Sequence, residues 1–183
     1  LLYGEEAVGH SKDEASMILN HKIAFAYVRE NRDQFRTVTR EGIEQVHALL
    51  TCDLPIANNF RSGMVGVTGS TYRPLDNRYQ IEEAIEALCA AVERMPHGYA
   101  KALVTLLGLS YIQPFEDGNK RTARLVSNAI LLAYDCSPLS YRSVSEEEYR
   151  EAVLVFYELN SLQPFKRLFI EQYTFAADTY LVR

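Results

Sequence analysis

The spacing of apolar residues along the chain predicts a mainly helical protein. In residues 80–95 the apolar side chains of Ile81, Ile85 and Leu88 recur three and four residues apart, and residues 98–112 repeat this pattern. Such spacing places the apolar side chains on one face of a helix. Helices are predicted over residues 13–32, 39–52, 80–95, 98–112, 119–133, 145–160 and 164–182.

The stretch between the second and third predicted helices has a different pattern. Gly63, Gly66, Gly69 and Pro74 interrupt it, and this density of Gly and Pro suits a short β-hairpin. No internal repeat, linker or low-complexity segment divides the chain. We therefore expect a mainly α fold, in which residues 1–183 form a single helical-bundle domain with one β-hairpin.

Composition narrows the classes of function. The formal net charge of -5 argues against a broad nucleic-acid-binding surface in this domain. No apolar run approaches the roughly 20 residues that span a bilayer, and no signal-peptide pattern opens the chain, so no membrane partner is expected. Cys52, Cys89 and Cys136 are an odd, widely spaced set without a Cys-x-x-Cys pair, which favours a cytoplasmic location. Monomer and homodimer are both left open.

Residues 113–124 carry the most information about function. Pro114 favours an extended backbone at Gln113, so the preceding helix should end there. Gly118 and Asn119 predict a loop apex followed by a helix N-cap, because an Asn side chain can accept a bond from the first free N–H groups. An apolar period after this point predicts the next helix.

That helix begins with cations, which reverses the usual charge order. Lys120, Arg121 and Arg124 occupy its first two turns, whereas residues 145–160 open with Ser145 and three glutamates. Free N–H groups, the positive end of the helix dipole and nearby cations together predict a phosphate-binding site. The alternative is an ordinary amphipathic helix whose arginines are solvated surface charge.

Two acidic residues precede the same helix. Mg²⁺ favours one or two carboxylates together with substrate phosphate oxygens, so Asp117, beside Glu116, is a candidate Mg²⁺ ligand. Phe115 is apolar in a polar loop and is predicted to anchor that loop in the core.

Residues 113–124 resemble the signature loop of the Fic (filamentation induced by cAMP) domain family, His-x-Phe-x-(Asp/Glu)-Gly-Asn-x-Arg-x-x-Arg. Residues 58–75 are similar to the β-hairpin flap that precedes this loop in the family, and residues 141–173 to the end of such a domain. The resemblance covers nearly the whole chain. It implies a Fic-type helical bundle that transfers AMP from ATP to a protein hydroxyl. The positions that match the motif are Phe115, Asp117, Gly118, Asn119, Arg121 and Arg124.

The resemblance also implies roles for the loop residues. Arg121 and Arg124 would hold the β- and γ-phosphates of ATP, and Asp117 would coordinate Mg²⁺. The α-phosphate would lie on Asn119 and on the backbone of residues 118–120.

Two other regions acquire expected roles in the same way. The flap would pair with an extended segment of the target protein by strand addition and lay its hydroxyl over Gln113. Tyr157 and Asn160 lie one turn apart on the helix that carries the base pocket in the family. A core position is favoured for Tyr157, and Asn160 is a candidate nucleotide-binding residue. The candidate target-binding residues of the flap are Met64, Val65, Gly66, Val67 and Thr68.

Gln113 departs from the family motif, which has there the His that acts as general base on the target hydroxyl. An amide does not take up a proton near neutral pH, although it can still orient a hydroxyl. A positioned acid–base group is worth about 10²–10⁴-fold in rate, so weakened or altered activity is expected. No histidine lies near the motif in sequence, so none is expected to replace the base. The histidines are His10, His21, His47 and His97.

Lys120 is a second departure, because the AMP-transferring members usually have Gly there. Lys at this position is similar to the Doc toxins, relatives that transfer a phosphate. Three hypotheses therefore stand: an ATP- and Mg²⁺-dependent AMP transferase, a nucleotide-sensing protein without transfer activity, and a Doc-like phosphotransferase. Arg61 and Arg73, which flank the flap, are predicted to be solvated at the surface.

Residues 1–4 resemble the segment that follows an inhibitory helix in some Fic proteins. On this basis the inhibitory Glu is expected just upstream of residue 1, and the chain is expected to be a fragment of a longer protein.

Overall fold

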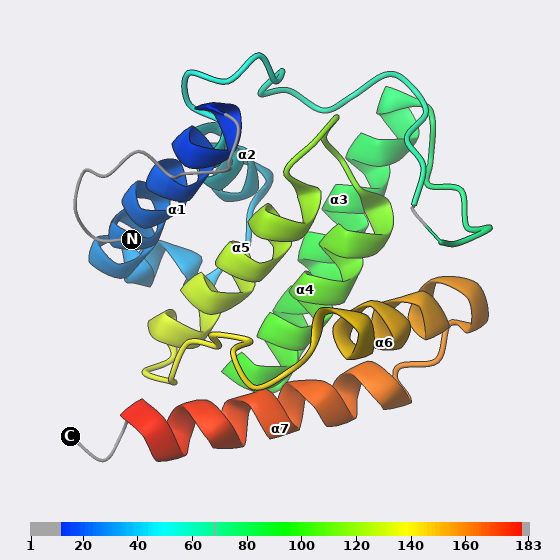
Figure 1. Ribbon diagram of the computed structural model, residues 1–183. Helices are drawn as coiled ribbons and strands as arrows, with labels where there is room; N and C mark the ends of the chain where they lie inside the picture. The colour runs from blue at the N-terminus through cyan, green and yellow to red at the C-terminus, as the bar shows by residue number, and fades with distance from the viewer. Residues whose placement is uncertain (1–11, 68, 181–183) are drawn as a thin grey trace.

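The computed structural model describes residues 12–67 and 69–180, and this part of the chain is mainly helical, as predicted (Figure 1). The predicted helices at 98–112 and 119–133 begin and end at the predicted residues, and the others agree to within a few residues. A short 3-10 helix, η1, covers Arg32–Arg36. The α-helices are α1 (Lys12–Glu30), α2 (Arg40–Leu50), α3 (Arg78–Glu93), α4 (Gly98–Ile112), α5 (Asn119–Ala133), α6 (Glu146–Leu159) and α7 (Gln163–Tyr180).

The helices α4 and α5 form an antiparallel pair at the centre of the bundle (Figure 1). The helices α1 and α2 flank this pair on one side, α3 packs against α4, and α6 and α7 lie together on another side. Leu106 and Leu109 of α4 and Leu125 and Ile130 of α5 are at most 1% exposed. Burial of such side chains stabilises the fold by about 1.5–3 kcal/mol each. The loop between α4 and α5 is therefore held between two of the most deeply buried helices.

Side-chain caps fix the starts of several helices. Thr39, Asn77, His97 and Ser145 each accept a hydrogen bond from a backbone N–H in the first turn of α2, α3, α4 and α6, respectively. Capping of this kind typically contributes about 1 kcal/mol to helix stability.

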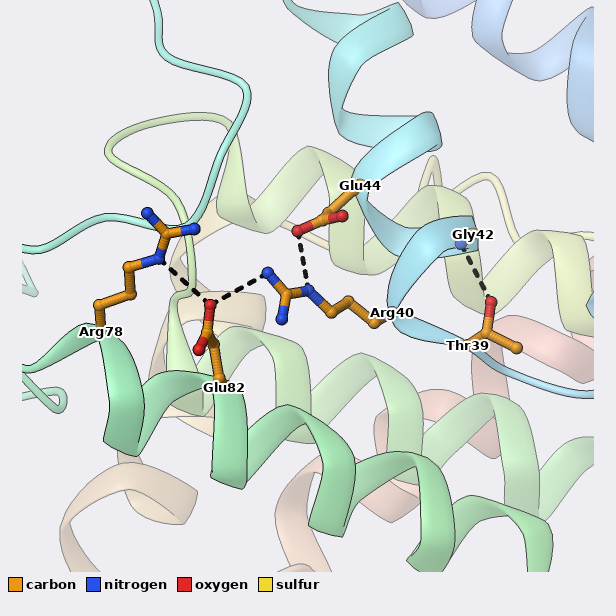
Figure 2. Close-up of polar contacts among 6 residues, drawn as sticks. All are labelled: Thr39, Arg40, Gly42, Glu44, Arg78 and Glu82. Carbon is orange, nitrogen blue, oxygen red and sulfur yellow. Dashed lines mark hydrogen bonds and ion pairs between the residues drawn. The ribbon is translucent and has the colours of Figure 1, made fainter.

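An ion-pair network joins the starts of α2 and α3 (Figure 2). Arg40 donates hydrogen bonds to Glu44 on its own helix (3.0 Å) and to Glu82 on α3 (3.1 Å). Arg78 also donates to Glu82, at 3.2 Å. The guanidinium of Arg40 lies 4.7 Å from the centre of the Phe60 ring. The network thus also contacts the segment that leads from α2 to α3.

The described residues do not support the predicted β-hairpin. None of the described residues between α2 and α3 is in a β-strand, and we refer to residues 58–75 of this connection as the strap. Two backbone N–H groups of the strap donate to groups outside it: Arg61 N donates to Pro114 O (2.9 Å) and Thr71 N to the carboxylate of Glu158 (3.2 Å). Within the strap, Ser70 N donates to Val67 O (3.1 Å), which forms a single turn and no strand pairing. Its Asn, Gly and Pro residues have low β-propensity, so contacts with the end of α4, the loop that follows it and α6 determine its path.

Within the described residues, no helix combines the length and the apolar character that a membrane span requires.

Candidate functional site

The loop from Gln113 to Gly118 lies where the C-terminal end of α4 meets the N-terminal end of α5. Gln113 ends α4 in the left-handed backbone region, at φ 48°, and Gly118 occupies the same region at φ 78°. Glycine adopts this conformation freely, whereas Gln does so only at a cost. Pro114 follows Gln113, and Phe115 is completely buried, as predicted.

The start of α5 differs from the prediction, which made Asn119 the N-cap. Gly118 is the N-cap, and it has no side chain to cap the helix. Asn119 is the first helical residue, and its side chain turns back to Phe115: its Nδ2 donates to Phe115 O (2.7 Å) and its Oδ1 accepts from Phe115 N (2.9 Å). The first backbone bond of the helix runs from Thr122 N to Gly118 O. The N–H groups of residues 119–121 therefore have no side-chain cap.

Three cations surround this uncapped end. Lys120 is exposed, Arg121 and Arg124 are half-buried, and all three line a cavity of about 400 Å³. No carboxylate of the described residues lies within ion-pair distance of any of them. Unpaired cations beside free helix N–H groups are the features of an anion site. The other residues that line this cavity are Val65, Gly66, Val67, Gln113, Glu116, Asp117, Gly118 and Asn119.

A second cavity of about 360 Å³ adjoins the first and shares Val67, Lys120 and Arg124 with it. Much of its wall comes from α6 and the residues just before that helix, and it combines apolar with polar side chains. The remaining lining residues are Ser110, Tyr141, Val144, Ser145, Glu146, Tyr149, Arg150, Val153, Leu154 and Tyr157.

Aromatic rings hold Arg124 in place. Its guanidinium carbon lies 6.0 Å from the centre of the Tyr141 ring and 5.8 Å from that of Tyr149. Burial raises the pKa of Tyr149 to about 12, against the opposing charge of Arg124. Tyr141 has a buried hydroxyl without a hydrogen-bond partner and a left-handed backbone at φ 55°. Such cation–π contacts leave the N–H groups of Arg124 available to an anion.

Of the two residues considered for the base pocket, one lines the second cavity and the other lines neither cavity. Tyr157 is 3% exposed, and its hydroxyl donates to Ser110 O at 2.6 Å, so it is a core residue that also lines the second cavity. Burial raises the pKa of Tyr157, and hydrogen bonds with Gln113 and Ser110 oppose this shift. Asn160 ends α6 in the left-handed region and is exposed, outside the residues that line either cavity.

The predicted target-binding residues of the strap also separate. Val65, Gly66 and Val67 line the first cavity, whereas Met64 is 79% exposed and does not line it. Thr68 lies outside the described residues, as does His10.

Arg61 was predicted at the surface, and this prediction is wrong, because the residue is 2% exposed. Its Nε donates to Gln113 O (2.7 Å), its Nη2 to Ile112 O (3.3 Å) and its Nη1 to Gly63 O (2.6 Å). Tyr72 Oη donates to the preceding carbonyl, that of Tyr111, at 3.0 Å. Together with the bond from Tyr157, these contacts satisfy four successive carbonyls at the end of α4. No local sequence pattern marks an arginine for this role.

Sequence analysis also missed His47, which lies directly beneath the loop. Its ring is fully buried and stacks on Phe115 with ring centres 3.6 Å apart. Its Nε2 donates to Asp117 O at 3.0 Å, and its Nδ1 is buried without a partner. Burial lowers the pKa of His47. His47 therefore supports the loop but does not present a nitrogen to a substrate. Since position 47 is distant in sequence from the loop, only the helix packing reveals this role.

The other described histidines are placed differently. His21 is exposed on α1, and partial desolvation, followed by the charges of Arg124 and Arg121, lowers its pKa. His97 accepts a hydrogen bond from Ala100 N as the N-cap of α4.

The carboxylates of the loop fit a cation that also binds substrate phosphate. Glu116 and Asp117 are exposed and line the first cavity, and Asp117 Oδ1 accepts a bond from Gly118 N at 2.6 Å. No group of three or more potential ligands among His, Cys, Asp and Glu occurs in the described residues. A set of one or two carboxylates suits Mg²⁺, which takes its other ligands from phosphate oxygens and water.

Comparison with known proteins places this arrangement in context. The family model described as the Fic/DOC family matches residues 14–131. The chain is 31% identical over 147 residues to the protein adenylyltransferase Fic of Nematostella vectensis, across 78% of this chain and 34% of that protein. It thus spans about a third of the length of this relative.

Solved structures share the fold. A fragment of Fic-1 from C. elegans (residues 134–508) superimposes with a TM-score of 0.79 at 20% identity, across 97% of this chain and 54% of that one. The BepC protein of Bartonella tribocorum, solved with bound AMPPNP, superimposes with a TM-score of 0.63 at 15% identity, across 88% of each chain.

Proposed function

Because this chain belongs to the Fic/DOC family, we propose that it binds ATP at the start of α5 and transfers AMP to protein hydroxyls, at a rate limited by Gln113. The observation that carries the proposal is the uncapped N-terminus of α5, which opens into a cavity lined by three cations that pair with no carboxylate of residues 12–67 and 69–180. A triphosphate supplies the negative charge that this end lacks. The Nematostella vectensis relative is a protein adenylyltransferase, and BepC binds AMPPNP, an ATP analogue.

Each side chain of the loop has a proposed task. Arg121 and Arg124 bind the β- and γ-phosphates, and the N–H groups of Asn119 and Lys120 bind the α-phosphate, beside the Gly118 N–H that donates to Asp117 Oδ1. Asn119 acts through the backbone, because its side chain is fully engaged with Phe115. The nucleoside then occupies the adjoining cavity beside α6.

Asp117, with Glu116 beside it, would hold Mg²⁺. The ion would neutralise charge on the phosphate oxygens during transfer.

In the transfer step the oxygen of the acceptor hydroxyl bonds to the α-phosphorus. The bond from that phosphorus to the bridging oxygen of the β-phosphate breaks, and pyrophosphate leaves. Gln113 accepts a hydrogen bond from the attacking hydroxyl but does not take its proton, which passes to water. Positioning and charge neutralisation supply most of the catalysis in phosphoryl transfer, so slow turnover continues without a general base.

The protein substrate would lie against the strap, with an extended segment beside Val65 and Val67, in the cytoplasm. Recognition through the backbone does not require a preformed hairpin, because an extended partner can order the strap as it binds.

A second candidate is a nucleotide-sensing protein that binds ATP without transferring AMP. The observation in its favour is that His47, the described histidine closest to the motif loop, has both ring nitrogens buried beneath it. The imidazole of His47 therefore cannot replace the missing base. The hypothesis that the chain is a Doc-like phosphotransferase is supported by Lys120 alone.

The test is incubation of this chain with ATP labelled at either the α- or the γ-phosphate, with Mg²⁺ and a cell lysate. The variant Gln113→His is run in parallel, and Arg124→Ala is the control for binding. We expect the unaltered chain to transfer a small amount of α-label to protein. Gln113→His should transfer the label about 10²–10⁴-fold faster, and Arg124→Ala should transfer no label.

Other outcomes select the alternatives. If both the unaltered chain and Gln113→His bind ATP but label no protein, the nucleotide-sensing hypothesis is the one that remains. Transfer of γ-label but not α-label would establish the phosphotransferase. Absence of ATP binding would overturn all three.

A further inference from the structure

We propose that Arg61 is a positioning residue that joins the strap to the motif loop, so that the roof and the floor of the candidate nucleotide cavity move as one unit. The floor is the loop from Gln113 into α5, and the roof is the part of the strap at residues 65–67. The proposal rests on the function proposed above, because it assigns Arg61 a role in nucleotide binding at the same site.

The hydrogen bonds of Arg61 connect these two parts directly. The side chain donates to Ile112 O at the end of α4, to Gln113 O on the floor and to Gly63 O in the strap. The backbone N–H of Arg61 donates to Pro114 O at 2.9 Å. Arg61 thus makes one bond to the last residue of α4, two to the start of the loop and one to the strap just before the residues that line the cavity.

The bonds act at the most strained point of the floor. Gln113 is a non-glycine residue at φ 48°, and such a conformation persists only where its surroundings enforce it. The bond from Arg61 Nε to Gln113 O, at 2.7 Å, is the shortest of the three that hold this turn. Loss of this bond would let the backbone relax and rotate the Gln113 side chain away from the cavity.

The planar guanidinium suits this task better than an ammonium group. Arg61 directs three N–H groups at three carbonyls from a rigid fork, whereas Lys offers a single nitrogen on a flexible stem. No carboxylate of the described residues pairs with Arg61, so its charge is directed entirely at backbone carbonyls. Burial accordingly lowers the pKa of Arg61, with Tyr72 and Asp76 opposing the shift.

The chain provides a matched control in Lys101. Its side chain is also buried, at 5% exposed, and also donates to carbonyls at a helix end, those of Val92 and Glu93 at the end of α3. It does not line either cavity. Substitution of Lys101 therefore also removes a buried cation from the carbonyls of a helix end, but at a place away from the strap and the loop.

The experiment compares Arg61→Met, Arg61→Lys and Lys101→Met with the unaltered chain at a temperature where each remains folded. Amide hydrogen exchange of the nucleotide-free protein measures local opening, and titration with ATP measures affinity. For Arg61→Met we expect exchange in both the strap and residues 113–122 to speed up by about tenfold or more, and ATP affinity to fall by a similar factor. Arg61→Lys should give exchange rates and an ATP affinity between those of Arg61→Met and the unaltered chain. Lys101→Met should lower the melting temperature but leave the local exchange rates and the ATP affinity unchanged.

The proposal fails if exchange in Arg61→Met rises evenly over the whole molecule, or rises in the strap but not in the loop. If Arg61→Met does not fold, the same comparison is made between Arg61→Lys and Lys101→Met. If the unaltered chain does not bind ATP, the proposed function fails, whereas the exchange result still decides whether Arg61 joins strap and loop.

Discussion

Single side chains determine how firmly the loop between α4 and α5 is held. His47 and Arg61 contact it from two different elements, one from α2 and one from the strap. His47 combines two contacts that can be separated by substitution: a ring stacked on Phe115 and a hydrogen bond to Asp117 O.

We predict that His47→Phe and His47→Gln destabilise the protein for different reasons. His47→Phe keeps a ring on Phe115 but leaves Asp117 O without its donor, which costs about 1–3 kcal/mol. His47→Gln keeps a donor but loses the stacked ring, worth about 0.5–1.5 kcal/mol beyond area burial. Urea unfolding gives the free energies, and exchange of the Gly118 amide should speed up more in His47→Phe. Equal exchange in the two variants would show that the hydrogen bond does not fix the loop.

At the scale of elements, the first turn of α5 has a charge order that opposes the stability of the helix. Lys120 lies beside the positive end of the helix dipole, where a carboxylate would be favourable. Stability and binding should therefore respond in opposite directions to a change of charge at this position.

We predict that Lys120→Glu raises the free energy of unfolding by about 0.3–1 kcal/mol, because it places an acid in the first turn of α5. The same variant should weaken ATP binding, since it replaces a cation of the cavity with an anion. Lys120→Gln is the control that removes the charge without reversing it. Urea unfolding and ATP titration at low salt provide the two measurements. A variant that binds ATP as tightly as the unaltered chain would remove Lys120 from the proposed site.

Packing between α3 and α4 depends on Gly108. A Cβ atom there would lie 2.4 Å from Leu88 Cδ1, which is far inside contact distance. We predict that Gly108→Ala destabilises the protein by about 1–3 kcal/mol through overpacking. Gly63→Ala is the control, because a Cβ at that position meets nothing within 4 Å. Thermal unfolding distinguishes them, and equal melting temperatures would mean that Leu88 moves aside without cost.

The elements also show what the sequence could and could not predict. The helices α4 and α5 were predicted to the residue because Pro114 and Gly118 mark their ends and apolar spacing marks their faces. The strap was assigned as a hairpin because Gly and Pro indicate a turn but do not specify the partners of its backbone. Those partners, such as Pro114 O and Glu158, lie more than 50 residues away.

The same limit applied to the candidate site. The cations of the first turn were visible because their charge order contradicts the helix dipole. The residues that support the loop, Arg61 and His47, could not be predicted, because the sequence does not show whether a given Arg or His is buried or solvated.

For the whole molecule, buried titratable groups predict a stability plateau bounded on both sides. Burial lowers the pKa of His47 from 6.5, so the unfolded state binds protons more readily. Stability is therefore complete above about pH 6.5 and falls as pH drops towards the lowered pKa. The pKa values of Tyr141 and Tyr149 are raised from 10.0, to about 12 for Tyr149. Their contribution is complete below about pH 10 and is lost as pH rises through the raised values.

The measurement is the free energy of unfolding in urea from pH 5 to 11. We expect His47→Gln to flatten the acidic side and to leave the basic side unchanged. If the free energy of unfolding of this variant still falls as steeply at acidic pH, the loss of stability there comes from other groups, such as the exposed His21.

The covered carbonyls at the end of α4 have an electrostatic consequence. The carboxyl end of a helix carries about half a negative elementary charge, and in this fold that end points into the same loop as the positive start of α5. Tyr157, Tyr72 and Arg61 donate to these carbonyls, and the guanidinium adds a full positive charge. The two opposite helix poles therefore do not cancel. An approaching polyphosphate experiences the attraction of α5 with little of the repulsion of α4.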